Sequence, residues 1–206
     1  MARQRSVVEA PPEEAQLDLD DGGRPMRADA RRNYEGLVVA ARKVFASQGV
    51  DASLEAIARE AGVGVGTLYR HFPKRIDVVE AVYRTDVDEL VHTAEEVTAT
   101  LEPWPAVVAF LEAFVRYAQS KRTLLNELRG FFEKNPDFKL RTRERIDDAM
   151  ETVISRGQAA GVVRTDVNGS DITALVAPMC TNATLTEQQA ARLLPMILDG
   201  LRPPSS

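Results

Sequence analysis

The sequence of 206 residues predicts an all-α protein of about nine helices. Apolar residues recur at i, i+3, i+4 and i+7 in successive segments, as over Leu54–Ala61, and this spacing is typical of helices that pack on a core. Helix-start signals mark the joins between segments, among them Asn135-Pro136 and Thr186 with Gln189. The sequence holds no convincing strand pair and no internal repeat.

The first predicted helix spans roughly Ala28–Gln48 and ends at Gly49. Its apolar face is formed by Leu37, Ala40, Ala41, Val44 and Phe45. This helix is expected to support the segment that follows it.

Two short helices separated by a glycine-containing turn come next. Ser53 is placed to cap a helix over Leu54–Ala61, and Gly62 stands where that helix must stop. A second helix starts near Val65 and ends around His71. Two short helices joined by such a turn are the sequence form of a helix-turn-helix.

The second short helix carries groups that can hydrogen-bond phosphate, namely Thr67, Tyr69, Arg70 and His71. The charge of the chain supports this interpretation. Residues 27–76 hold nine basic and five acidic residues, a net charge of +4, although the whole chain carries -5. Positive charge gathered on one segment is the electrostatic footprint of a DNA-binding surface.

The stretch LEAIAREAGVGVGTLYRHFP, residues 54–73, resembles the DNA-binding domain of TetR-family transcriptional regulators. The resemblance covers roughly residues 27–76 and implies phosphate contacts for Thr67, Tyr69, His71 and Arg75. Base reading would fall to Gly64, Val65, Gly66 and Arg70, with Val65 able to touch a thymine methyl. Lys74 departs from the family pattern, because it replaces a small polar capping residue and adds a charge. His71 has an alternative role as a neutral spacer packed against Phe72.

The remaining predicted helices are longer. They cover 74–98, 103–120, 122–132, 136–160, 171–184 and 187–201. Asn135 and Ser170 are the expected caps of the fourth and fifth of these, and Thr186 with Gln189 forms a capping box for the last. Pro178 and Pro195 lie inside the last two helices and are expected to kink them.

The patterns predict three regions: a disordered tail over 1–26, a helix-turn-helix domain over 27–76 and a helical domain over 77–206. The resemblance implies that the helical domain binds an effector and forms the dimer. The resemblance makes Arg24 and Arg27 candidates for an arm that enters the adjacent minor groove, although a solvated helix start is the favoured explanation.

The resemblance implies a homodimer built from the last two helices of each subunit. The expected interface residues are Leu175, Val176, Met179, Leu193, Leu194, Ile197 and Leu198. An intramolecular core is the alternative explanation for these apolar side chains. Two copies related by a two-fold axis would address a pseudo-palindromic operator in double-stranded DNA.

The resemblance also implies a small-molecule effector held between the helices of the second domain. Candidate ligand-binding residues are Phe110, Phe114, Tyr117, Leu125, Leu128, Arg129, Phe132 and Met150. Apolar side chains at helical spacing more often form an ordinary core, and that is the alternative explanation for each of these residues.

Several function classes find no support in the sequence. No apolar run approaches the roughly eighteen residues of a membrane span, and the N-terminus lacks the apolar stretch of a signal peptide, so a cytoplasmic protein is expected. His92 has no nearby nucleophile or second ligand, and the consecutive pair Asp147-Asp148 reads as solvated surface. We therefore expect no enzyme activity, no metal site and no cofactor.

The sequence favours a ligand-released repressor that binds DNA as a dimer. Two alternatives stay open: a helical small-molecule-binding protein whose DNA module is vestigial, and a DNA binder without effector control.

Overall fold

The computed structural model describes residues 28–49, 51–182 and 186–204. Within these residues the chain forms eight α-helices and no strand, which confirms the all-α class. The helices are α1 (Ala28–Gln48), α2 (Leu54–Glu60), α3 (Val65–His71), α4 (Arg75–Thr100), α5 (Pro103–Lys134), α6 (Pro136–Ala159), α7 (Gly169–Thr181) and α8 (Glu187–Gly200). The predicted N-terminal tail, with Arg24 and Arg27, lies outside the described residues.

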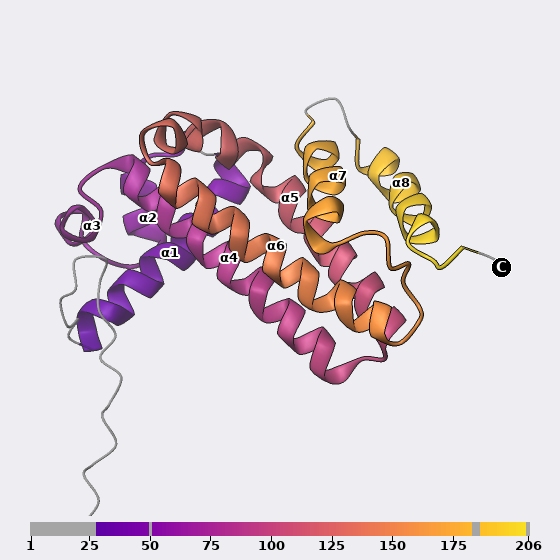
Figure 1. Ribbon diagram of the computed structural model, residues 1–206. Coiled ribbons are helices and arrows are strands. Elements are labelled where there is room, and N and C mark those ends of the chain that lie inside the picture. The colour runs from indigo at the N-terminus through magenta and orange to yellow at the C-terminus, as the bar shows by residue number, and fades with distance from the viewer. Residues whose placement is uncertain (1–27, 50, 183–185, 205–206) are drawn as a thin grey trace, which may run out of the picture.

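The long helices α4, α5 and α6 pack against one another and form the centre of the molecule (Figure 1). Helix α1 joins this centre to α2 and α3 by packing on both α2 and α4. Helix α7 packs on α5 and α6, whereas α8 packs on α5. In Figure 1, α3 therefore lies at one end of the molecule, and α7 and α8 lie at the other.

One apolar core runs through both parts of the fold. It includes the predicted face of α1, where Leu37 and Ala41 are fully buried. It continues through Val79 and Val82 of α4 to Phe110 of α5. Because α4 contributes to the core from its first turns onward, the helix-turn-helix segment and the helical bundle share packed side chains.

Two predicted details of the helix limits are wrong. The segments predicted as 103–120 and 122–132 are one continuous helix, α5, because no breaking residue separates them. Asn135 does not cap α6 with its side chain; its amide instead donates to the carbonyl of Phe131 at 3.0 Å and closes the end of α5.

The start of α7 also differs from the prediction. Asn168, rather than Ser170, caps the helix, and its side-chain oxygen accepts from the Asp171 amide at 3.0 Å. Gly169 allows this turn to press against α6, where an added Cβ would lie 2.7 Å from the Cα of Glu151. The predicted capping box at α8 is confirmed: the Gln189 amide donates to the Thr186 hydroxyl at 3.2 Å, and the Thr186 amide donates back to the Gln189 side chain at 2.9 Å.

Candidate functional site

The turn between α2 and α3 has the geometry that the sequence predicts. The Ser53 hydroxyl accepts from the Ala56 amide at 3.1 Å and caps α2. Gly62 has a φ of +68°, a left-handed conformation that suits glycine, and this residue ends the helix. The Val63 amide donates to the Ala58 carbonyl at 3.0 Å and closes the turn. These bonds fix the direction in which α3 leaves α2.

Helix α3 has one buried anchor and an exposed face. Leu68 is fully buried in the core, and α3 packs on α2, so the helix cannot rotate without exposing it. Tyr69 is 45% exposed and Val65 is 38% exposed. Gly66 and Arg70 are also exposed, and Thr67 is half-buried. Of the residues predicted to contact phosphates and bases, Val65, Gly66, Tyr69 and Arg70 therefore lie on the accessible side of this short helix.

His71 lies at the end of α3 against two other aromatic rings. Its ring centroid is 6.3 Å from that of Tyr34 in α1 and 6.4 Å from that of Phe72. Burial, and then the positive charge of Arg70, lowers the pKa of His71 below the ordinary imidazole value. A neutral imidazole packed in this way is compatible with the alternative role as a spacer, and it still carries one N–H donor.

Lys74 and Arg75 are placed differently from each other. Lys74 is exposed and precedes α4, where its backbone amide donates to the Asp77 carboxylate at 2.8 Å. This bond satisfies the amide of Lys74, whereas the Lys74 side chain caps no amide of α4. Arg75 turns inward: its Nη1 donates to the Ala52 carbonyl at 2.7 Å, and its guanidinium lies 5.9 Å from the Phe45 ring centre. Arg75 therefore holds the loop before α2 in place.

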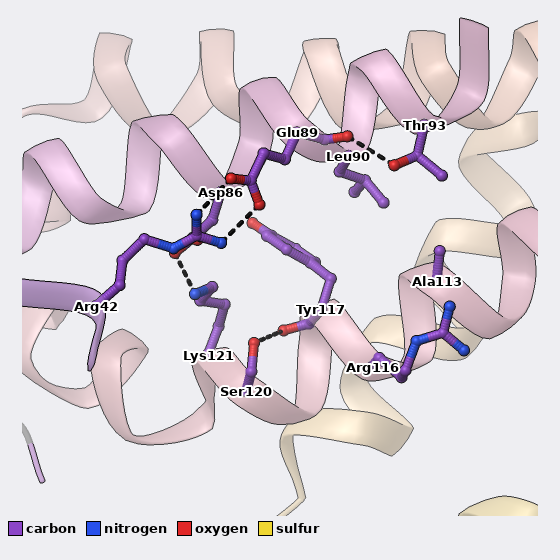
Figure 2. A pocket seen from close by; sticks show the side chains of 10 residues that line it. All are labelled: Arg42, Asp86, Glu89, Leu90, Thr93, Ala113, Arg116, Tyr117, Ser120 and Lys121. Atoms are coloured by element: carbon purple, nitrogen blue, oxygen red, sulfur yellow. Dashed lines mark hydrogen bonds and ion pairs between the residues drawn. The ribbon is translucent and has the colours of Figure 1, made fainter. Parts of the chain in front are cut away.

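A cluster of four charged side chains connects α1 to α4 and α5 (Figure 2), and sequence reasoning missed it. Asp86 of α4 is 3% exposed. It pairs with Lys121 of α5, and the Arg42 Nη2 of α1 lies 2.7 Å from its Oδ1. The same guanidinium donates to Glu89 Oε2 at 2.6 Å, and a second bond joins Arg42 to the other oxygen of Glu89. We call these residues the Arg42–Lys121 cluster.

The pKa values within the Arg42–Lys121 cluster follow from burial and pairing. Burial raises the pKa of Asp86, and the pairing with Lys121 and Arg42 opposes that rise. The hydrogen bond from Arg42 lowers the pKa of the more exposed Glu89.

The cluster borders a pocket of about 280 Å³ whose wall also includes Tyr117. The Tyr117 hydroxyl is buried and lies near that of Tyr83, but it makes no hydrogen bond of normal geometry within the described residues.

A second pocket, of about 200 Å³, lies between α4, α5, α6 and α7. Of the predicted ligand-binding residues, Phe114, Tyr117 and Phe132 line it. Sequence reasoning missed the other residues of its lining, which are Tyr83, Ala118, Lys121, Lys139, Arg143, Ile146, Thr173 and Ala177. We call it the α4–α7 pocket.

The other predicted ligand-binding residues lie elsewhere. Phe110, Leu128 and Met150 are fully buried and do not line the α4–α7 pocket. Arg129 is exposed to solvent. The Leu125 side chain lies outside the described residues.

The predicted interface residues on α7 and α8 fall into three groups. Val176 is fully buried within the chain, which matches the intramolecular alternative. Leu175 is 58% exposed, and Met196 of α8, which was not among the predicted residues, is 67% exposed. The remaining predicted residues are half-buried: Met179, Leu193, Leu194, Ile197 and Leu198. Both Pro178 and Pro195 lie inside helices that continue past them.

The described residues contain no group of three or more His, Cys, Asp or Glu side chains arranged to hold a metal ion. None of the helices in this part of the chain combines the length and the apolar character needed to cross a bilayer. A cytoplasmic location stays a prediction.

Two family models match the chain. Residues 37–82 match the model of the N-terminal domain described as bacterial regulatory proteins, tetR family. Residues 102–203 match the model described as transcriptional regulator SbtR-like, C-terminal domain. The first match contains the helix-turn-helix, and the second contains the whole of α5 to α8.

Solved structures and curated proteins agree with these matches. A TetR transcriptional regulator from Streptomyces coelicolor is 37% identical, covers 84% of this chain and 99% of its own, and has a TM-score of 0.71. A TetR regulatory protein from Mycobacterium vanbaalenii is 32% identical over 86% of this chain and 99% of its own, with a TM-score of 0.69. An HTH-type transcriptional regulator of Staphylococcus aureus is 42% identical over 64 residues, 31% of this chain. The chain matches about a third, 35%, of the length of that curated relative.

Both family models and both near-complete structural matches lead to one conclusion: the chain belongs to the TetR family of helix-turn-helix transcriptional regulators.

Proposed function

We propose that the protein is a dimeric repressor that binds a pseudo-palindromic operator through α3 of each subunit and releases it when a small-molecule effector binds. In this proposal residues 27–76 form the DNA-binding domain and residues 77–206 form the effector-binding and dimerisation domain. The protein acts by binding and not by catalysis.

The surface of α3 is the observation that carries this proposal. Tyr69 and Arg70 extend from a seven-residue helix that the buried Leu68 anchors. Hydroxyl and guanidinium donors of this kind position a protein on DNA phosphates. The surrounding segment carries a net charge of +4 in a chain of -5, so the favourable potential for DNA is concentrated there.

The length of α3 makes a dimer part of recognition. A helix of seven residues extends only about 10 Å, so one copy reads a few base pairs. The exposed Leu175 and Met196, with the half-buried apolar face of α8, offer a surface that a second copy of the chain would cover. A two-fold axis there would place two α3 helices on half-sites about one helical turn of DNA apart.

Repression released by an effector requires a ligand that prefers the DNA-incompetent state. A hundredfold preference corresponds to about 2.8 kcal/mol. Helix α4 is suited to transmit this difference, because its first turn contacts the helix-turn-helix through Arg75 and its later turns line the α4–α7 pocket through Tyr83.

DNA binding is tested with fluorescence anisotropy on a duplex taken from upstream of the protein's own gene. Tyr69→Phe and Thr67→Val each remove one hydroxyl from α3 without disturbing Leu68. We expect each variant to bind at least about tenfold more weakly, as the loss of one hydrogen bond to a charged phosphate predicts. Arg141→Gln on α6 is the control, because it removes an exposed cation far from α3 in sequence. No salt-dependent binding by the wild type would contradict the proposal.

Dimer formation is tested separately by sedimentation equilibrium. Leu175→Glu places a charge at a side chain that is 58% exposed in the single chain, so the fold of the subunit should be retained. We expect this variant to be monomeric and to lose operator binding, while Leu140→Glu, at an equally exposed leucine of α6, stays dimeric. A Leu175→Glu variant that remains a dimer would place the interface elsewhere.

A further inference from the structure

We propose that the α4–α7 pocket binds a small organic anion, a compact apolar body that carries one carboxylate. This inference rests on the proposed function only where it concerns DNA release; the binding site itself stands on the geometry of the pocket.

The walls of the α4–α7 pocket are mostly apolar. Phe114 and Ala118 of α5, Phe132 further along α5, and Ile146 of α6 contribute carbon surface. Tyr83 of α4 contacts Phe132 edge-on, with ring centres 5.7 Å apart. A lining of this kind selects an apolar ligand body and favours a flat or short one.

The size of the pocket limits the ligand. Its volume of about 200 Å³ lies below the roughly 300–1,000 Å³ of pockets for drug-sized ligands. Since a water molecule in the liquid occupies about 30 Å³, this space corresponds to roughly seven waters. A single substituted ring or a short alkyl chain fits that volume.

The charged side chains that line the α4–α7 pocket are all cationic. Lys121 lies on its inner side with only 11% of its side chain exposed, whereas Lys139 and Arg143 of α6 are exposed to solvent. Among the described residues of the lining, none is acidic. Two carboxylates outside the lining pair with these cations. Asp86 pairs with Lys121, and the Oδ2 of Asp147, whose side chain is 20% exposed, lies 3.4 Å from the Arg143 Nε. Apolar walls with cationic donors select a ligand with an apolar body and an anionic group.

The position of Lys121 connects this pocket to the DNA-binding part of the molecule. Lys121 and Tyr117 line both the α4–α7 pocket and the pocket of the Arg42–Lys121 cluster. A carboxylate bound beside Lys121 competes with Asp86 for the same ammonium group. Since Asp86 also holds Arg42 of α1, the competition reaches the helix that supports α3.

The test measures ligand binding by calorimetry on the DNA-free full-length protein, with phenylacetate as the probe. Phenylacetamide is the matched neutral probe, because it has the same ring and nearly the same volume. We expect phenylacetate to bind at least tenfold more tightly than phenylacetamide, as a charge-assisted hydrogen bond predicts. Octanoate against octanamide repeats the comparison for an alkyl body.

Two double variants locate the site. Lys139→Gln with Arg143→Gln removes the two exposed cations that line the α4–α7 pocket. Arg141→Gln with Arg145→Gln removes two cations from the same helix that line a different pocket, beside Arg84 and Asp88. Both variants change the net charge equally. We expect the first to weaken phenylacetate binding at least tenfold and the second to change it less than twofold.

Three results would overturn the inference. The first is equal affinity for phenylacetate and phenylacetamide, and the second is an equal effect of the two double variants on phenylacetate binding. The third is no binding of phenylacetate or octanoate up to about 10 mM; a dissociation constant of that size corresponds to a binding free energy of only about -3 kcal/mol. DNA release is measured in a separate anisotropy experiment. If the acids bind but the operator is not released, the anion site is retained and effector-released repression fails.

Discussion

Replacing Lys121 by methionine will destabilise the protein far more than replacing Arg145 by methionine, although each cation pairs with a carboxylate of α4. The two pairs differ in burial. The side chains of Lys121 and Asp86 are 11% and 2% exposed, whereas those of Arg145 and Asp88 are 47% and 60% exposed, with the charged atoms 2.7 Å apart.

The expected magnitudes follow from this difference. Removing one partner of a buried ion pair costs about 3–5 kcal/mol, because the other charge stays buried without compensation. Arg42 remains 2.7 Å from Asp86 in Lys121→Met, so we expect the lower end of that range, about 3 kcal/mol. Losing an exposed pair costs about 0–1 kcal/mol, so Arg145→Met will change the free energy of unfolding by less than about 1 kcal/mol.

The assay is equilibrium unfolding in urea at pH 7, extended to a double-mutant cycle. Asp86→Asn and Lys121→Met each leave one charge of the pair buried, but the two changes together remove both charges. The double variant should therefore cost less than the sum of the single variants by at least about 1.5 kcal/mol. Additive costs, or a Lys121→Met variant no less stable than Arg145→Met, would refute the assignment of this pair as a buried, coupled one.

Three further predictions concern the rest of the molecule. Gly169→Ala will lower the free energy of unfolding, measured in urea, by about 1–3 kcal/mol, because the added Cβ would lie 2.9 Å from the Asp147 carbonyl oxygen. Gly130→Ala is the control: it has open space around it, so this substitution will raise the free energy of unfolding by up to about 1 kcal/mol. Arg75→Gln will lower the free energy of unfolding by about 1–3 kcal/mol in the same assay, because the hydrogen bond to the Ala52 carbonyl is lost. Unchanged stability would leave phosphate contact as the role of Arg75. Burial lowers the pKa of His71 in the free protein, and a phosphate beside it would raise that pKa in the complex. Binding would then take up a proton, so DNA affinity measured by anisotropy will rise as the pH falls from 7.5 to about 5.5 in the wild type but not in His71→Gln; pH-independent affinity in both would assign His71 to packing.

The helix-turn-helix could be predicted from the sequence because its determinants are local. The Ser53 cap, the left-handed Gly62 and the buried Leu68 each act over a few residues, and the helical period reports which side of α3 is buried. The same reasoning found most helix limits, the capping box at Thr186 and the all-α class.

The details that decide function in the helical bundle depend on residues far apart in the chain. The bond from Arg75 to Ala52 spans 23 positions, and the pairing of Asp86 with Lys121 joins two helices whose relative rotation no local pattern reports. Apolar periodicity marks Phe110 and Phe114 alike, yet only Phe114 lines the α4–α7 pocket. The sequence by itself therefore determined which segments are helices and which side chains the short helix α3 leaves exposed, because those choices follow from short-range hydrogen bonds and burial. The tertiary structure alone decided which charges are buried together and where space remains between helices, because both depend on how α4, α5, α6 and α7 pack.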